Sequence, residues 1–261
     1  MDAPIEQPFD AVEIIQTNGI TFIDLATDAD PTTSIPSCPG WTVADIAEHL
    51  ADCWNFWSRV VADGITDRND LRSIESPTGL EGQMLLDWLA TTHNALYSAL
   101  VRAAPGQPAW SWAGSDLTAE WVRRRMVHES AVHLWDIANA VGHPYEVPTA
   151  VAADGIDEFL TDFMGYRRME GAMKVGGTVH LHCTDTTEND VAGGEWFVAS
   201  VKEPGCTFTR EHRKGDAAIR GRAHDLLMWL WRRNGDRPDS LEFIGDDVVA
   251  RRFGAFTDLD F

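Results

Sequence analysis

The sequence lacks the features that would place it in a membrane or on nucleic acid. No stretch of its 261 residues reaches the roughly 18 apolar residues that a membrane-spanning helix requires. Positive charge is scarce, with 21 Lys and Arg against 41 Asp and Glu and a net charge of −20. Because phosphate backbones and anionic lipids are bound by clustered cations, we expect neither a nucleic-acid partner nor a membrane partner.

Cysteine is also sparse. The four cysteines lie far apart and form no C-x-x-C pair, which excludes a zinc finger built from cysteine; they are Cys38, Cys53, Cys183 and Cys206. Reduced thiols in a cytosolic protein are the expected state. The first residues, 1–6, contain neither the basic region nor the apolar run of a signal peptide, so we expect a cytoplasmic location.

The residues that are abundant indicate a folded protein with large aromatic surfaces. Hydrophobic residues make up 44% and charged residues 24%, as in globular domains. Eight of the eleven tryptophans lie between residues 41 and 135. Such a concentration of large aromatic side chains is typical of a core or of the walls of a pocket, so the first half is where we expect a ligand site.

The first 141 residues show helical periodicity. Apolar residues recur every three or four positions in four segments, residues 9–25, 43–60, 85–101 and 118–141, the first interrupted by Asn18 and Gly19. Thr42 is placed to cap the second helix with Asp45 three residues on, and Gly142 stands where a helix-ending glycine is expected. Four helices of this length predict a four-helix bundle.

The pattern changes after Pro144 and Pro148. A helix over residues 149–164 is followed by short alternating segments typical of strands, at 178–184, 195–201, 207–210, 217–220 and 240–244, and by helices at 223–233 and 247–256. Residues 203–205 have the composition of a hairpin turn. We therefore predict an α+β protein: a helical domain over residues 1–148 and a small α+β domain, with a mostly antiparallel sheet, over residues 149–261.

Three side chains of the helical part could bind a metal. Glu129 and His133 are four residues apart on one helix and share a face, whereas His128 points about 140° away from His133. His49 lies at the edge of the apolar face of the second helix. Two histidines and a carboxylate with an open position suit catalytic zinc, and iron uses the same set. A Glu–His hydrogen bond beside an unrelated core histidine would leave the same pattern.

Other polar residues allow two interpretations each. His180 and His182 share one face of a predicted strand and could bind a metal or form an ordinary polar face. Asp136 could orient His133 or form a surface ion pair. The basic run 123–125 could meet an anionic group, although a solvated helix face is the more common outcome. Cys53 could approach the metal, but an ordinary buried cysteine is expected.

Two segments resemble a known family. Residues 38–50, C-P-G-W-T-V-A-D-I-A-E-H-L, and residues 128–136, H-E-S-A-V-H-L-W-D, are similar to motifs of the mycothiol-dependent maleylpyruvate isomerase family. Residues 157–160, 180–185 and 219–227 resemble its C-terminal part, so the resemblance covers almost the whole chain. It implies a DinB-like four-helix bundle followed by an α+β domain similar to sterol-carrier folds.

The resemblance also implies a site. His49, Glu129 and His133 match the family's ligands for a divalent metal, usually zinc, and the thiol cosubstrate would be mycothiol, the low-molecular-weight thiol of actinobacteria. Arg233 matches an arginine with a catalytic role, although an arginine at a helix end is also favoured by the helix dipole. The family's isomerases carry Thr-Gly before that arginine, whereas this chain has Trp231 and Arg232.

These observations lead to one expected function and two alternatives. The expected function is a metal-dependent thiol enzyme that adds mycothiol to a small electrophile, as an isomerase or an S-transferase. The alternatives are a metal-dependent hydrolase that uses metal-bound water, and a binding protein that keeps the fold without the chemistry. We expect the partners to be a small-molecule substrate and the thiol, and the protein to be a monomer or a homodimer.

Overall fold

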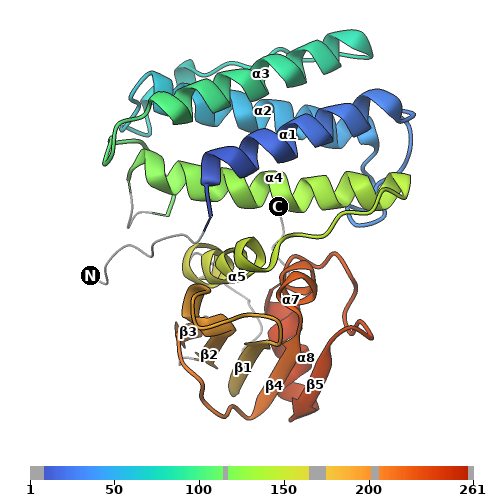
Figure 1. Cartoon of the computed structure of the whole chain (residues 1–261), viewed down its shortest axis with the longest axis vertical. Coiled ribbons are helices and arrows are strands. Elements are labelled where there is room, and N and C mark those ends of the chain that lie inside the picture. The colour runs from blue at the N-terminus through green and yellow to red at the C-terminus, as the bar shows by residue number, and fades with distance from the viewer. Residues whose placement is uncertain (1–8, 114–116, 165–174, 201–205, 258–261) are drawn as a thin grey trace. The chain divides into compact units, whose positions relative to one another are not determined.

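The chain folds into two compact units. The computed structural model describes residues 9–113, 117–164, 175–200 and 206–257 (Figure 1). One unit comprises residues 10–146 and the other contains residues 147–261. We retain 1–148 and 149–261 as the proposed domain limits.

The first unit is a bundle of four long helices, as predicted. They are α1 (Ala11–Asp28), α2 (Val43–Ala62), α3 (Gln83–Arg102) and α4 (Ala119–Val141), with a short 3₁₀ turn at Asp70–Ser73. α1 packs mainly on α4, and α2 packs mainly on α3 (Figure 1). The buried faces carry the apolar residues of the helical pattern, such as Ile46, Leu50 and Leu89.

The ends of the helices follow the expected chemistry. Thr42 accepts a hydrogen bond from the backbone of Asp45, and the Asp45 carboxylate accepts one from the backbone of Thr42, which is a complete capping box at the start of α2. Gly142 ends α4 in the left-handed conformation with a φ of 71°. The predicted caps of both helices are therefore confirmed.

The predicted interruption of the first helix is wrong, because Asn18 and Gly19 lie inside a continuous α1. The reason is tertiary packing. Glycine at position 19 leaves room for the buried side chain of His93, which contacts the carbonyl oxygen of Ile15 at 3.2 Å through Nε2. The close approach of α3 to α1 thus offsets the low helix propensity of glycine.

Gly19→Ala is expected to destabilise the bundle. A Cβ atom at this position would lie 2.1 Å from Nε2 of His93, which is far inside contact distance. Overpacking of this kind costs about 1–3 kcal/mol of unfolding free energy, although alanine favours the helix by itself. Urea denaturation of Gly19→Ala, His93→Ala and the double variant tests this. The substitution at position 19 should cost much less in the His93→Ala background, and an equal cost in both backgrounds would contradict the packing explanation.

The second unit is built on a five-stranded sheet with the order β3-β2-β1-β4-β5. The strands are β1 (Thr178–Cys183), β2 (Glu195–Ser200), β3 (Cys206–Thr209), β4 (Ala217–Gly221) and β5 (Glu242–Gly245). β1 and β4 are parallel, and the other three pairs are antiparallel. The predicted α+β class with a mostly antiparallel sheet is confirmed. The predicted hairpin turn at 203–205 lies outside the described residues.

Helices complete the second unit. They are α5 (Thr149–Glu158), which continues into a π-helical turn at Phe159–Phe163, α7 (Ala223–Leu230) and α8 (Asp247–Phe256), with a 3₁₀ turn at Val191–Gly194. α5 packs against α7, and α8 contacts β1 and β4. Their buried residues, with those of β1, form the core of this unit.

α7 ends earlier than the predicted residue 233. Arg232 adopts the left-handed region with a φ of 64°, and its backbone N–H donates to the carbonyl of Trp229. The N–H of Arg233 donates to the carbonyl of Met228. These two bonds form a Schellman motif, whose left-handed position is normally occupied by glycine. Because an arginine stands there in this chain, the sequence did not indicate the end of the helix.

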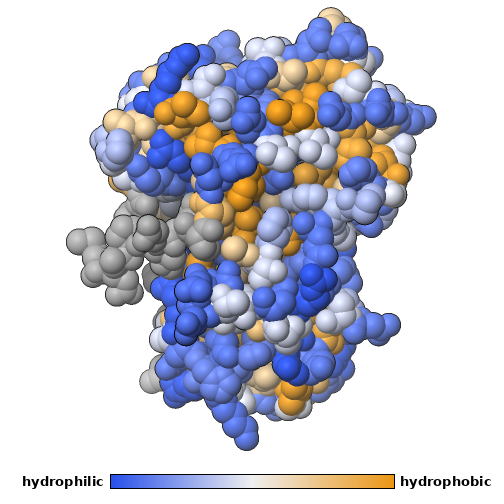
Figure 2. Space-filling model, in the orientation of Figure 1, coloured by the Kyte–Doolittle hydropathy of each residue, from blue (hydrophilic) through white to orange (hydrophobic). Residues whose placement is uncertain are grey.

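The surface agrees with the composition. Among the described residues, no helix is both long enough and apolar enough to cross a bilayer. Hydrophilic side chains cover much of the face in Figure 2, and apolar ones are scattered among them. The large apolar side chains that are exposed include Ile20, Met84 and Val101 of the helical unit.

Candidate metal centre

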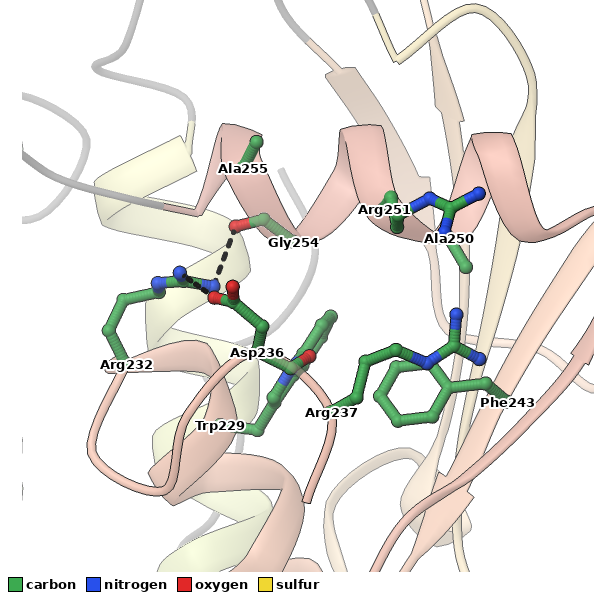
Figure 3. A pocket seen from close by; sticks show the side chains of 9 residues that line it. All are labelled: Trp229, Arg232, Asp236, Arg237, Phe243, Ala250, Arg251, Gly254 and Ala255. Carbon is green, nitrogen blue, oxygen red and sulfur yellow. Dashed lines mark hydrogen bonds and ion pairs between the residues drawn. The ribbon is translucent and has the colours of Figure 1, made fainter. Parts of the chain in front are cut away.

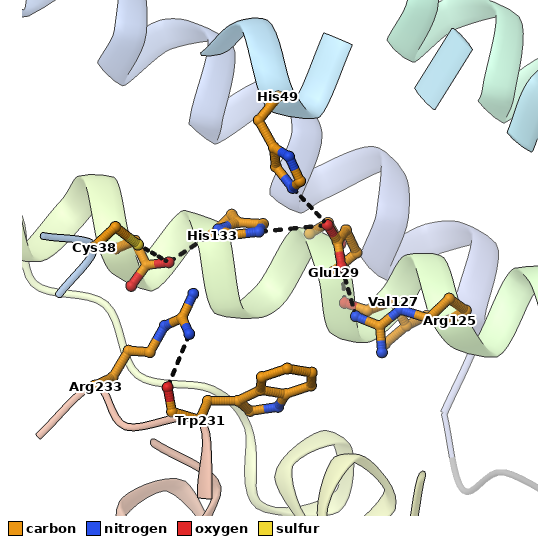
Figure 4. A network of polar contacts seen from close by, with 10 residues as sticks. Cys38, His49, Arg125, Val127, Glu129, His133, Trp231 and Arg233 are labelled. Atoms are coloured by element: carbon orange, nitrogen blue, oxygen red, sulfur yellow. Dashed lines mark hydrogen bonds and ion pairs between the residues drawn. The ribbon is translucent and has the colours of Figure 1, made fainter. Parts of the chain in front are cut away.

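The candidate centre is formed by α2 and α4 of the bundle. The capping box fixes the start of α2 and thereby places His49 two turns inside it. Glu129 and His133 lie one turn apart on α4. The three side chains converge, and each offers a ligand atom within 4.8 Å of the others (Figure 4). The structure therefore brings together the three residues singled out from the sequence.

The geometry at the centre suits a divalent metal. Nε2 of His49 lies 3.0 Å from Oε1 of Glu129, and Nε2 of His133 lies 3.4 Å from the same oxygen. The His49 and His133 rings are 4.9 Å apart and nearly perpendicular. A tetrahedral zinc ion with ligands at about 2.0–2.1 Å separates its ligand atoms by similar distances. Two nitrogens and one oxygen leave a fourth position for another ligand.

Arg125 holds the free oxygen of the Glu129 carboxylate. Its Nη2 lies 2.6 Å from Oε2 of Glu129, and its side chain is only 5% exposed. Burial alone would raise the pKa of Glu129, but the charge of Arg125 and hydrogen bonds from His133 and His49 outweigh burial and lower the pKa well below its usual range. Glu129 is therefore ionised and able to bind a cation.

The expectation of a solvated basic face at residues 123–125 is wrong for two of its members. Arg125 is buried in the centre, and Arg123 donates to the carbonyl oxygens of Leu100 and Ala103 at the end of α3. These orphan carbonyls need donors, and a long arginine side chain supplies them. The spacing of four residues between Arg125 and Glu129 was the one sequence signal that could have indicated the ion pair.

Asp136 fixes the orientation of His133. Its Oδ2 lies 2.9 Å from Nδ1 of His133, which leaves Nε2 directed at the centre. Ser37 donates to Oδ1 of Asp136 at 2.6 Å, and the sulfur of Cys38 lies 3.5 Å from Oδ2. Burial would lower the pKa of His133, but the contacts with Asp136 and Glu129 raise it. The segment before α2 thus supports a ligand on α4, and Ser37 was not anticipated from the sequence.

Asp136→Asn is expected to weaken metal binding while leaving all three ligands in place. The amide cannot stabilise the His133 N–H as a carboxylate does, and such supporting residues usually change metal affinity about 10–100-fold. Competition titration of zinc against a chromophoric chelator measures the change. Asp87→Asn, at an exposed position of α3, is the control, and equal affinity in the two variants would contradict this role.

Neighbouring residues complete the surroundings of the centre. The Trp41 ring lies 5.1 Å from that of His49. Burial raises the pKa of the Cys53 thiol well above its usual range, and the nearby Glu129 raises it further, so Cys53 stays protonated. His128 is fully buried on a different face of α4 and does not join the cluster.

Comparison with known protein families decides the relationship. Residues 15–138 match the mycothiol maleylpyruvate isomerase N-terminal domain, and residues 150–252 match the MDMPI C-terminal domain. The two matches follow each other along almost the whole chain. The chain belongs to the mycothiol maleylpyruvate isomerase family.

Solved structures share the fold. The crystal structure of the mycothiol-dependent maleylpyruvate isomerase matches with a TM-score of 0.59, covering 89% of this chain and 91% of that chain at 10% identity. A crystal structure of a histidine-to-alanine mutant of that isomerase matches over the same shares with a TM-score of 0.57, also at 10% identity. No curated protein matches the sequence. The prediction of an enzyme agrees with these relatives, whose names are those of enzymes.

The other candidate residue of this family member lies in the second unit. Arg233 follows α7, and its Nη1 donates to the carbonyl of Trp231 at 2.8 Å. It is partly buried and lies 5.9 Å above the Trp231 ring. The Schellman ending described above fixes its backbone, so Arg233 is held in place by local structure.

A separate hollow of about 300 Å³ lies within the second unit (Figure 3). Its walls include Trp229 and Phe243. Two arginines, Arg232 and Arg237, reach it from the connection between α7 and β5, and Arg251 reaches it from α8. Arg232 pairs with Asp236, and the other two share Asp247. Because each of these arginines already has a carboxylate partner, we assign no site to the hollow.

Proposed function

We propose that the protein is a metal-dependent thiol enzyme in which His49, Glu129 and His133 hold a divalent metal, and that this metal is zinc. The open set of two nitrogens and one carboxylate oxygen on α2 and α4 carries this proposal. The residues fit such an ion, because the carboxylate is ionised and Asp136 leaves Nε2 of His133 free for the metal. When bound, zinc lowers the pKa of a thiol ligand and keeps it as thiolate at neutral pH.

The surrounding residues would prepare the centre for that chemistry. Arg125 keeps Glu129 charged and fixed, and Asp136 prevents rotation of the His133 ring. The Trp41 ring lies against that of His49, with 5.1 Å between the ring centroids, and would shield one side of the imidazole. The thiol would approach the centre from the side of His49, whose side chain is 38% exposed and is the most accessible of the three.

The proposed cosubstrate is mycothiol, and the proposed substrate is a small unsaturated acid of the maleylpyruvate type. The thiolate sulfur adds to one carbon of the cis double bond, and the electron pair moves onto the conjugated carbonyl oxygen. After rotation about the resulting single bond, the electron pair returns from the oxygen to re-form the double bond, the C–S bond breaks, and the trans isomer and the thiolate are released. If the thiolate displaced a leaving group and stayed attached, the same site would act as an S-transferase.

Arg233→Gln is expected to reduce turnover without changing metal content. In the proposal, Arg233 holds the substrate carboxylate or the oxygen that gains charge, and loss of such a donor lowers kcat/KM about 10²–10³-fold. Steady-state kinetics together with elemental analysis check this. Arg252→Gln, at an exposed position of α8, is the matched control. Equal kinetics of the two variants would show that Arg233 has no catalytic role.

Thiol dependence tests the proposed function. Wild-type protein and His49→Ala are assayed for isomerisation of maleylpyruvate with and without mycothiol. The proposal predicts turnover only with both thiol and an intact centre, and a loss of at least about 10³-fold in His49→Ala. Hydrolysis of an amide or thiol conjugate without added thiol would favour the hydrolase instead. Ligand binding that survives in His49→Ala, with no turnover by any protein, would favour a binding protein.

The remaining expectations belong to this proposal. A cytosolic enzyme of this kind keeps its cysteines reduced, and all four are free thiols. We propose that its partners are small molecules, with no nucleic acid or membrane, and that it acts as a monomer or a homodimer. Iron(II) would use the same three ligands, so the metal is identified by analysis of the purified protein.

A further inference from the structure

A second cluster of metal-binding side chains lies on the sheet of the other unit. β1 and β2 are antiparallel neighbours, and His182 stands opposite Glu195. His180 is two residues from His182, so both point to the same face. His212 reaches this face from the segment after β3. The cluster therefore joins three histidines, one-third of the nine in the chain, to one carboxylate.

The distances within this cluster are short. Nε2 of His180 lies 3.1 Å from Oε2 of Glu195, and Nδ1 of His182 lies 2.9 Å from Oε1. Nδ1 of His212 also contacts Oε2. The ring of His180 lies 5.7 Å from that of His182 and 5.1 Å from that of His212. The four ligand atoms all lie within 4.8 Å of one another.

We propose that His180, His182, His212 and Glu195 form a second divalent-metal site, of the closed, structural kind, that takes zinc. Ligands at about 2.0–2.1 Å in a tetrahedron are about 3.3 Å apart, close to the distances of His180 and His182 from the Glu195 carboxylate. Three nitrogens and one oxygen fill all four positions, which leaves none for a substrate. The bound ion would tie the segment that contains His212 to the β1–β2 pair.

The environment supports ligands that are ready for a cation. Burial lowers the pKa of His180, which favours the neutral ring that can donate a lone pair. Burial acts to raise the pKa of Glu195, but contacts with the histidines lower it, and the carboxylate is charged. The nearby Arg213 lies 4.3 Å over the Phe197 ring and pairs with Glu211, so its charge is partly balanced.

Metal counting on matched variants tests this second site independently of the first. The protein is stripped with chelator, loaded with zinc alone, freed of excess ion and analysed for zinc. We expect two ions per chain in the wild type, one in His49→Ala, one in His212→Gln, and none in the double variant. His212 is suited to substitution because its side chain is 77% exposed, and His143→Gln, another exposed histidine, should retain two ions.

A stability readout separates binding from loss of fold. In the His49→Ala background, zinc should raise the Tm, and adding His182→Gln or Glu195→Gln should abolish the rise and weaken zinc binding at least about tenfold. Circular dichroism of the stripped variants checks their folding. Unchanged zinc content in His212→Gln and Glu195→Gln would overturn the second site and leave a hydrogen-bonded cluster. Failure of His49→Ala to lose an ion would count against the first site only.

Discussion

Glu129→Gln is expected to lose the metal proposed for the α2–α4 centre and at least about 10³-fold of the proposed thiol-dependent turnover. Glutamine has nearly the same shape but no charge, and it would place an amide where the proposal needs an anionic ligand. It would also leave Arg125, which is 5% exposed, beside a neutral group. Zinc analysis, together with turnover of maleylpyruvate in the presence of mycothiol, measures both effects.

Glu120→Gln is the matched control for this prediction. Glu120 lies on the same helix and pairs with Arg123, but its side chain is 42% exposed. Its contact with Arg123 is long, at 3.4 Å, and Arg123 keeps its bonds to the end of α3 without it, so this variant should keep its metal and its turnover. If Glu129→Gln retained zinc at the wild-type affinity in a His212→Gln background, the carboxylate would not be a ligand.

Arg125→Met is expected to destabilise the metal-free protein by about 3–5 kcal/mol, because it leaves the Glu129 carboxylate, which is only 16% exposed, without its main charged partner. The pKa of Glu129 is held below its ordinary value of 4.5, so the pair stabilises the fold above that pH. This stabilisation is lost as the pH falls through the lowered pKa, and the wild type and the variant should converge in acid. Urea denaturation at several pH values, after removal of metal, measures the difference.

Metal should restore part of the stability that Arg125→Met loses. A cation at His49, Glu129 and His133 would neutralise the same carboxylate that Arg125 neutralises. Zinc should therefore raise the unfolding free energy of the variant more than that of the wild type. Arg59→Met is the control, because Arg59 and its partner Asp63 are both more than 40% exposed. A loss of less than about 1 kcal/mol of unfolding free energy for Arg125→Met in metal-free protein would show that the Arg125–Glu129 pair contributes no more than an exposed ion pair, which would contradict this prediction.

The sequence predicted the bundle because its helices carry their own signals. The capping box at Thr42 and Asp45 and the glycine at 142 are local features, and local features are visible in sequence. Gly19 misled the prediction because its role depends on His93, which is 74 residues away and belongs to another helix. The early end of α7 was not predicted because Arg232 adopts a left-handed conformation that glycine usually occupies, so no residue type in the sequence indicated it.

The three residues of the candidate centre were predicted from helix spacing and from the family motifs. Glu129 and His133 share a helical face by spacing, but their meeting with His49 depends on how α2 packs in the bundle, and the family resemblance supplied that step. The Arg125 ion pair was missed because a run of three arginines suggested solvent, whereas only the fold shows which of them turns inward. The alternation of His180 and His182 showed a shared face, and the fold added His212 and Glu195.

Cobalt substitution followed by titration with mycothiol tests the central claim most directly. The claim is that His49, Glu129 and His133 hold a metal that binds the thiol as thiolate. Cobalt-loaded protein in the His212→Gln background should develop a thiolate-to-cobalt charge-transfer band in the near ultraviolet, and the same protein with His49→Ala should not. A protein that binds cobalt at these residues but shows no band with the thiol, or a band that persists unchanged in His49→Ala, would contradict the account.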